Sequence, residues 1–545
     1  MSPASIKRSV MTAFIKRARF SGFGLAICLA ALLSGGSAFA KIIVVPKWGR
    51  FEQSFKSGID YQYPLQQCTL RVTFTSPGGE TNTVFGFWDG DKTWRVRFSP
   101  DQPGRWTYHT SCSDLANQRL NDQTGDFLCT AVIGDSRFAQ HGPVRLTRDR
   151  RQFEHADGTP FFWMADVAWN APRLSTPRDW ITYTQTRAGE HFSAVQWAAA
   201  PGNDVENRPA FTGQSHIAID PRYFRDLDGK IDMMNRAGLL SVIAPLWGDN
   251  GSAANLPEDQ MKLLVRYMTA RWGAYDVAWL LTVDDGRSER WLRIGRQIFG
   301  DTHHAPVILF PGALASSFGE FQNEDWVDAF GFGLGQNVNN DSLEWLVSGP
   351  LQHLWTNAPA RPFINVLPPL ENGFTAQGQD RITADDTRRI AWWSLLLTPP
   401  AGVSYGAQDV ATWNTAKQSK MPTWQLSLFL PGARQMTNIV ALFKTDDCQG
   451  LRPAPNAIVN QPGHDAPRRY IASARTESRD LIVTYVPEDR EFELYVDALP
   501  PAPNIQWLNP RTGRKNAAVA VVGMRTCQLP TPDAGDWVLI VKSGK

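Results

Sequence analysis

The pattern of apolar and polar positions divides the chain into three regions after an N-terminal leader. From residue 41 to 138, short runs such as Leu70–Thr75 alternate apolar and polar residues, and turns such as Ser76–Gly79 separate them. An alternation of this kind is typical of strands with one buried face, and short strands at this spacing predict a β-sandwich. The pattern returns from residue 441 to 545, in runs such as Leu481–Val486, and predicts a second sandwich there.

Residues 139–440 have a different pattern, in which apolar runs alternate with helical periodicity such as that of Tyr223–Ala237. Eight runs are candidate strands: Phe161–Met164, Ala194–Trp197, Leu239–Pro245, Val277–Val283, Val307–Phe310, Val327–Phe332, Phe363–Leu367 and Gly402–Tyr405. Strands that alternate with helices are typical of βα units. We therefore predict an α/β fold, a (β/α)₈ TIM barrel flanked by two all-β sandwich domains.

The first forty residues have the pattern of a secretory signal peptide. A basic region precedes the apolar run Phe23–Leu33, and Ala38, Phe39 and Ala40 form a cleavage signal. We expect cleavage after Ala40 and a periplasmic or secreted protein. The apolar run is too short for a membrane span, and no later segment predicts one.

Charge and composition narrow the classes of function. Removal of the leader's five positive charges turns a formal net charge of +2 into −3. A nearly neutral chain argues against nucleic acid and against a membrane surface as partners. The sequence has neither a phosphate-binding loop nor a Cys/His cluster, so we predict no cofactor and no metal. The 21 Trp residues are notable because sugar rings stack on flat indole faces, although most should pack in cores.

Five cysteines remain after cleavage, and an exported protein can keep disulfides. Their clustering along the chain predicts the pairs Cys112–Cys129 and Cys448–Cys527, which leaves Cys68 unpaired.

Two predicted barrel strands lead into carboxylates. The run Phe363–Leu367 ends at two prolines, and Glu371 follows; the run Val277–Val283 leads into Asp284. Catalytic groups of a (β/α)₈ barrel follow the C-terminal ends of its strands, and hydrolysis of a glycosidic bond needs two carboxylates. We predict Asp284 as the acid/base and Glu371 as the nucleophile. The structural alternatives are a helix cap for Asp284 and an ion pair with a residue such as Arg381 for Glu371.

Other side chains at or near predicted strand ends are candidates for binding the sugar. Asp166 follows the first strand and is expected to bind a substrate hydroxyl, with a helix cap as the alternative. The further substrate-binding candidates are Trp169, Trp197, Trp247, Gln336 and Tyr405.

The segment His155–Trp169 resembles the opening of the apiosidase-like glycoside hydrolases, whose members typically read DGTPFFWLGDTAW there. Arg271–Tyr275 and Trp279–Asp284 also match that family. Val84–Gly90 resembles the sandwich that often precedes such barrels, and Asn509–Gly513 resembles a C-terminal sandwich of the collagen-binding type. The resemblance covers essentially the whole mature chain.

The resemblance implies a retaining glycosidase on a (β/α)₈ barrel, and the few characterised members release apiose from complex pectin. This chain departs from the family at two places. Leu281-Thr282-Val283 stands where members read L-G-G, and Leu367 stands where they carry the first Glu of G-E-P-x-Y-E. If the nucleophile is that first Glu, this chain lacks it; if it is the second, Glu371 supplies it.

We therefore expect an exported glycoside hydrolase that cleaves a complex polysaccharide, such as a pectic side chain, by a two-carboxylate retaining mechanism. Its partner would be a poly- or oligosaccharide. One alternative is a non-catalytic carbohydrate-binding protein on a degenerate barrel, and another is a scaffold whose sandwiches carry the function. The carboxyl groups of a retaining pair stand about 5–5.5 Å apart. A pair at this distance would favour the hydrolase over the carbohydrate-binding protein.

Overall fold

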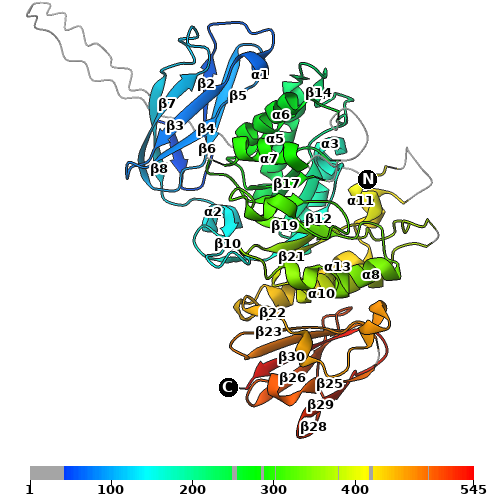
Figure 1. The fold of residues 1–545 in the computed structure, drawn as a ribbon. Coiled ribbons are helices and arrows are strands. Elements are labelled where there is room, and N and C mark those ends of the chain that lie inside the picture. Colours follow the sequence, from blue (N-terminus) through cyan, green and yellow to red (C-terminus); the bar gives the residue numbers. More distant parts are fainter. Residues whose placement is uncertain are drawn as a thin grey trace, which may run out of the picture. The chain divides into compact units, whose positions relative to one another are not determined.

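The structure, a computed structural model, describes residues 42–247, 255–283, 288–300, 302–378, 380–415, 422–488 and 490–544 (Figure 1). The predicted signal peptide lies outside these ranges. Among the helices that they contain, none has the length and apolar character needed to cross a membrane.

The N-terminal region forms two sheets packed on one core, as the alternating pattern predicts, and their strands pair antiparallel except for β1, which runs parallel to β8. One sheet has the strand order β1-β8-β7-β3-β4 and the other β2-β6-β5. Phe51 and Phe127 stack between them, with ring centroids 4.2 Å apart. The strands are β1 (Val44–Pro46), β2 (Phe51–Lys56), β3 (Leu70–Thr75), β4 (Thr81–Phe85), β5 (Phe87–Trp88), β6 (Thr93–Phe98), β7 (Gly104–Cys112) and β8 (Thr124–Thr130).

The central region is a closed barrel of eight parallel strands, which confirms the predicted fold class. In their order around the barrel they are β12 (Trp163–Val167), β13 (Ala194–Ala198), β16 (Leu240–Ala244), β17 (Val277–Thr282), β18 (Val307–Phe310), β19 (Ala329–Gly333), β20 (Phe363–Leu367) and β21 (Pro400–Tyr405). Both faces of these strands are buried because one face fills the barrel and the other meets the helices.

Helices cover the outside of the barrel, as Figure 1 shows for α5, α6 and α7. They include α4 (Pro177–Gly189), α5 (Pro221–Arg236), α6 (Glu258–Trp272), α7 (Ser288–Ile298), α8 (Asn340–Ser348), α10 (Ala384–Leu396) and α13 (Pro431–Phe443). Thr383 begins α10 with a capping box: its side chain accepts from the Asp386 N–H, and the Asp386 carboxylate accepts from the Thr383 N–H.

Two core layers distinguish the faces of the barrel strands. Side chains such as Ala165, Val242 and Val366 belong to the cluster inside the barrel. Their neighbours in sequence, such as Met164 and Ile243, belong to the cluster between the strands and the helices. The cluster to which a residue belongs therefore tells whether its side chain points into the barrel or away from it.

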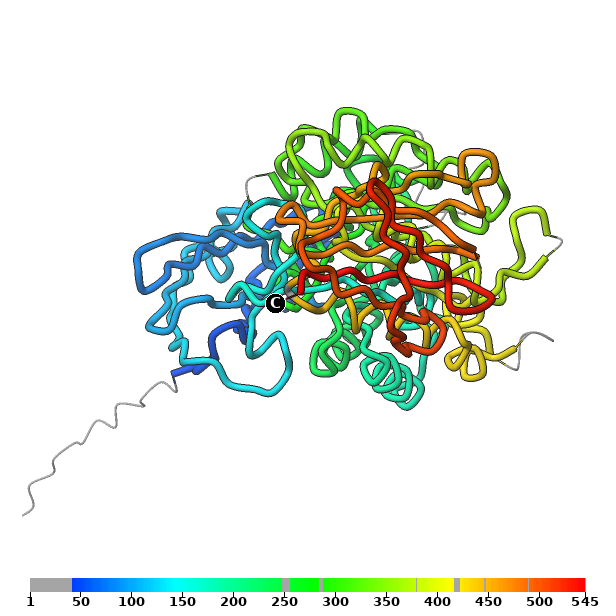
Figure 2. Tube along the Cα trace, turned by 90° about the horizontal axis from the view of Figure 1, so that it is seen from below, coloured from blue at the N-terminus to red at the C-terminus, as the bar shows by residue number. Residues whose placement is uncertain are grey.

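The C-terminal region is a second sandwich, drawn orange to red in Figure 2. Its sheets have the orders β22-β23-β24-β30-β26-β27 and β25-β29-β28. The strands are β22 (Leu451–Pro453), β23 (Ala472–Thr476), β24 (Leu481–Val486), β25 (Glu491–Tyr495), β26 (Pro503–Leu508), β27 (Lys515–Ala517), β28 (Val521–Val522), β29 (Thr526–Pro530) and β30 (Trp537–Ser543).

Buried polar contacts join both sandwiches to the barrel helices. On the N-terminal side, Arg97 of β6 and Arg271 of α6 both donate to the Asp228 carboxylate of α5, at 2.8 and 2.7 Å. On the C-terminal side, Arg388 of α10 forms two hydrogen bonds with Asp536, at 2.7 and 2.8 Å. The Tyr485 hydroxyl also donates to Asp536.

The cysteine pairs predicted from the sequence are wrong. Cys112 lies opposite Leu70, whereas Cys129 lies opposite Gly104 at the other end of β7, so these two thiols are far apart along the strand. Cys448 and Cys527 belong to different core clusters. The close pair is instead Cys68 and Cys112, with sulfur atoms 3.5 Å apart.

We predict that Cys68 and Cys112 form a disulfide when the protein is exposed to an oxidant, to which the two thiols give two protons and two electrons. Both side chains are buried, and a hydrogen bond from Cys68 lowers the pKa of Cys112 to about 7, which favours the reactive thiolate. The bond would stabilise the fold by about 2–4 kcal/mol. Peptide mapping without reductant should find the linked peptides, and alkylation of both thiols in the oxidised protein would contradict the prediction.

The half-buried carboxyl of Asp276, just before β17, makes the stability of the fold depend on pH. Burial raises the pKa of Asp276 to about 7 from an ordinary value of 3.8. Because the folded state binds this proton more tightly than the unfolded state, stability should fall as the pH rises from about 4 to about 7. We expect Asp276→Asn to raise the melting temperature more at pH 8 than at pH 4. An equal change at both values would contradict this assignment.

Candidate active site

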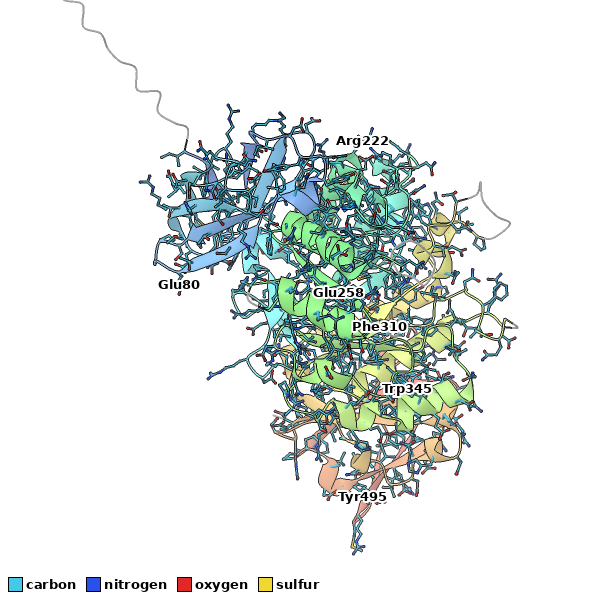
Figure 3. The ribbon with its side chains drawn as sticks, turned by 45° about the horizontal axis from the view of Figure 1, so that its top comes forward. Glu80, Arg222, Glu258, Phe310, Trp345 and Tyr495 are labelled. Atoms are coloured by element: carbon cyan, nitrogen blue, oxygen red, sulfur yellow. The ribbon has the colours of Figure 1, made fainter. Side chains whose placement is uncertain are left out.

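The carboxyl end of the barrel carries an aromatic platform. Trp169 follows β12 and Trp247 follows β16, and their rings stack with centroids 3.8 Å apart and planes 18° from parallel. Phe310, which ends β18 and is labelled in Figure 3, lies 6.0 Å from the Trp247 ring. Both indoles pack on the cluster inside the barrel and remain partly exposed. A partly open pair of indoles at this end can bind the apolar face of a sugar ring.

Amide side chains join the loops that follow three neighbouring barrel strands. Gln336 follows β19, and its side-chain NH₂ donates to the side-chain carbonyl oxygen of Gln408 at 3.0 Å. The side-chain carbonyl oxygen of Gln336 accepts from the Leu370 N–H at 2.9 Å. Gln336 therefore joins the loops that follow β19, β20 and β21, and its side chain is partly exposed.

Leu367 occupies the end of β20 at the mouth of the barrel. The register between β19 and β20 shifts at this point, so that Gly333 pairs with Leu367 and skips Val366. Leu367 packs against the cluster inside the barrel. The position at which the resembled family carries its first Glu thus presents an apolar side chain.

Glu371 lies on the helix side of the barrel wall. Its carboxylate accepts from the Tyr405 hydroxyl at 2.5 Å and from the Gly432 N–H, in the first turn of α13, at 3.0 Å. The residue is 4 % exposed. Burial raises the pKa of Glu371, and these two hydrogen bonds oppose the rise. The structure therefore gives this carboxylate two partners away from the mouth, and neither is a cation.

Asp166 also points away from the barrel interior. It is fully buried, accepts from the Tyr183 hydroxyl and from Arg187 Nε, both at 2.7 Å, and so joins β12 to α4. Burial raises the pKa of Asp166, and the Arg187 guanidinium opposes the rise. Arg187 itself is completely buried and also contacts Glu190 and the Leu428 carbonyl.

Two further predicted residues lie in the helix-facing layer. Trp197 packs against Trp272 and donates its ring N–H to the Ser241 hydroxyl at 2.8 Å. Tyr405 packs near Phe192, and its hydroxyl binds Glu371. The structure thus brings Trp169 and Trp247 together at the mouth and places Gln336 in the loops that follow β19, β20 and β21, whereas Asp166, Trp197, Tyr405 and Glu371 lie on the helix side.

Asp284 lies outside the described residues, two positions after Thr282 at the end of β17. Thr282 donates its hydroxyl to the Leu246 carbonyl and so ties the end of β17 to the segment that carries Trp247. Sequence reasoning missed the support that Phe310 gives to Trp247; Phe310 is the last residue of its strand and is buried in the cluster inside the barrel. Across the described part of the chain, no three His, Cys, Asp or Glu side chains are grouped to hold a metal ion.

Comparison with solved structures places this fold among those of glycoside hydrolases. A glycoside hydrolase structure has a TM-score of 0.66 at 18% identity and covers 76% of this chain and 99% of its own. A glycoside hydrolase family 5 structure from Bacteroides vulgatus ATCC 8482 has a TM-score of 0.66 at 17% identity, covering 75% and 94%. No curated protein matches the chain.

The family follows from the sequence itself. The apiosidase-like catalytic domain matches residues 147–449, which is more than half of the chain. The chain therefore belongs to the apiosidase-like family, and the protein is a glycosidase. A domain of unknown function matches residues 44–113, and a domain described as the "putative collagen-binding domain of a collagenase" matches residues 453–542.

Proposed function

We propose that this protein, after export, cleaves glycosidic bonds in a complex polysaccharide, with a pectic side chain as the substrate class that the family resemblance favours. The observation that carries the proposal is the stacked pair Trp169 and Trp247 at the carboxyl end of the barrel. A sugar ring held against this pair would lie beside the end of β17, which leads directly into Asp284.

The chemistry needs a carboxylic acid to protonate the leaving oxygen and a carboxylate to attack the anomeric carbon of the sugar. We assign the first role to Asp284. Glu371, the nucleophile predicted from the sequence, is bound to Tyr405 and Gly432 on the helix side, so we do not assign it the second role. We propose Asp249 instead, which, like Asp284, lies outside the described residues. Asp249 comes five residues after Ala244, the last residue of β16, and β16 pairs with β17.

The test is a hydrolysis screen of the mature protein on pectic and other plant polysaccharides. Asp284→Asn and Asp249→Asn should each lower kcat by about 10²–10⁴-fold. Asp285→Asn, one position from Asp284, is the matched control and should keep its activity. NMR of the first product will show whether the anomeric configuration is retained, as the family resemblance implies.

Two other outcomes would change the proposal. Full activity of the Asp284→Asn variant would remove this residue from the mechanism. Binding of a glycan without release of sugar from any substrate would favour a carbohydrate-binding protein on a degenerate barrel. The apolar side chain of Leu367 at the mouth is the observation that supports that alternative.

A further inference from the structure

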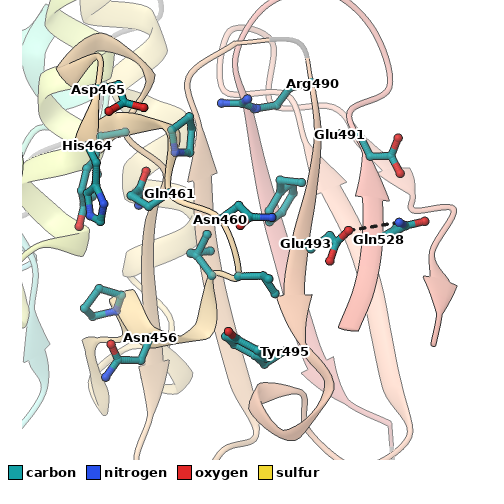
Figure 4. Close-up of a pocket in the computed structure, with 16 residues that line it drawn as sticks. Asn456, Asn460, Gln461, His464, Asp465, Arg490, Glu491, Glu493, Tyr495 and Gln528 are labelled. Atoms are coloured by element: carbon teal, nitrogen blue, oxygen red, sulfur yellow. Dashed lines mark hydrogen bonds between the residues drawn. The ribbon is translucent and has the colours of Figure 1, made fainter. Parts of the chain in front are cut away.

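The C-terminal sandwich has a groove of its own, with a volume of about 1190 Å³. One wall is the segment 455–465, and the other is formed by β25 and by Gln528 of β29 (Figure 4). Sites for small ligands usually have volumes of about 300–1,000 Å³, so this groove has room for an extended ligand. None of the residues predicted from the sequence lines it.

The backbone of the groove is fixed by contacts within the protein. Val459 N–H donates to the Glu493 carbonyl at 3.0 Å, which joins the two walls. The Gln461 side chain accepts from Gly463 N–H and Ile471 N–H and donates to the Ile471 carbonyl, so it holds its own wall in shape. A ligand would therefore find a preformed site and would not have to order a loop.

Other polar side chains of the groove are free to bind a ligand. Asn456 and Asn460 on one wall, and Glu491 and Tyr495 on the other, are exposed, and their side chains have no hydrogen-bond partner among the described residues. An amide offers both donors and an acceptor, which matches a sugar hydroxyl, itself a donor and an acceptor. Tyr495 is 40 % exposed and offers a flat ring face beside these groups.

The charges in the groove select against an acidic ligand. The residues that line the groove include three carboxylates, those of Asp465, Glu491 and Glu493, and one guanidinium, that of Arg490. Arg490 is already 3.5 Å from the Glu488 carboxylate. A polymer of uronic acids would meet a net negative charge, whereas a neutral sugar would not.

We propose that this groove is an accessory binding site for a neutral saccharide segment, separate from the barrel. Tyr495 would stack on a sugar ring, and Asn460 and Glu493 would bind its hydroxyls. The site would hold the enzyme on neutral regions of a polysaccharide while the barrel acts elsewhere on it. Because binding in the groove does not depend on hydrolysis, it can be tested whether or not the barrel cleaves the same polymer.

The test measures retention of the full mature chain by affinity electrophoresis in gels that contain neutral plant polysaccharides, with polygalacturonate and a collagen-like triple-helical peptide as other probes. Tyr495→Ala and Asn460→Ala should each weaken binding to the neutral polymer by about tenfold, equivalent to about 1.4 kcal/mol. Tyr495→Phe keeps the ring face and should bind nearly as the unchanged protein does. Met524→Ala, in the same sandwich at a residue 99 % exposed, is the matched control and should have no effect.

Hydrolysis of a short soluble substrate, measured in parallel, separates this proposal from the proposed activity. Tyr495→Ala should leave that rate unchanged, and a barrel without activity would leave the binding result intact. The proposal is overturned if no neutral polymer is retained, or if retention is unaffected by Tyr495→Ala and Asn460→Ala. Preference for polygalacturonate or for the collagen-like peptide would also overturn it, the latter in favour of a peptide-binding groove.

Discussion

Glu371→Gln should leave glycosidase activity within about tenfold of the unchanged protein, whereas removal of a true nucleophile costs several orders of magnitude. Tyr405 and Gly432 both donate to the same carboxylate oxygen, Oε2. The carbonyl oxygen of a glutamine can take that place and accept both hydrogen bonds. The substitution therefore keeps the two hydrogen bonds to Oε2, and it removes the charge and the longer contact of Gly432 N–H with Oε1, at 3.3 Å.

Glu371→Ala is the companion variant and should instead destabilise the fold. It leaves the Tyr405 hydroxyl and the Gly432 N–H buried without an acceptor, at about 1–3 kcal/mol for each. Chemical denaturation of both variants, together with kcat, separates the two roles. A stable Glu371→Gln protein that has lost activity by about 10³-fold would restore Glu371 as the nucleophile.

The second large effect concerns the buried pair of Asp166 and Arg187. Arg187→Met should lower the free energy of unfolding by about 3–5 kcal/mol, because it leaves the Asp166 carboxylate buried without its cation. The double variant Asp166→Leu with Arg187→Met should recover part of this loss, since it removes both charges. Urea denaturation measures both quantities.

Arg178→Met, at an exposed position on the same helix α4, is the control and should change stability by no more than about 0.5 kcal/mol. If Asp166 instead bound a substrate hydroxyl, Asp166→Asn would raise KM and leave stability unchanged. That result would contradict the structural role that its contacts with Tyr183 and Arg187 indicate.

The barrel is predictable because its strands are short, mainly apolar runs that alternate with helical patterns. The same property concealed which side chains face the site. Neighbouring residues of a strand point to opposite faces, and a strand buried on both faces has no polar alternation to mark the inner one. Asp166, Trp197 and Tyr405 were assigned to the site by nearness to a strand end, and all three proved to face the helices.

The predicted residues that lie at the mouth of the barrel come just after the ends of their strands. There, the alternation of side chains between the two faces of a strand no longer decides where a side chain lies. Trp169 and Trp247 are examples. Glu371 is harder to place from the sequence, because it lies four residues beyond the end of β20, after a register shift and two prolines, where strand parity no longer applies. The cysteines illustrate the same limit: Cys68 and Cys112 meet through the pairing of β3 with β7, which spacing along the chain does not reveal.

The contact between α10 and the C-terminal sandwich bears on how this protein can be divided. Trp392 and Tyr485 stack across that boundary with ring centroids 6.1 Å apart, and Trp393 donates its ring N–H to the Tyr470 carbonyl. Residues of both regions belong to one core cluster. A truncated chain that ends before the sandwich would uncover two tryptophans and take Asp536 away from the Arg388 guanidinium, so it should aggregate. The sandwich is thus no detachable module, and its transfer to another enzyme would require redesign of the face it leaves behind.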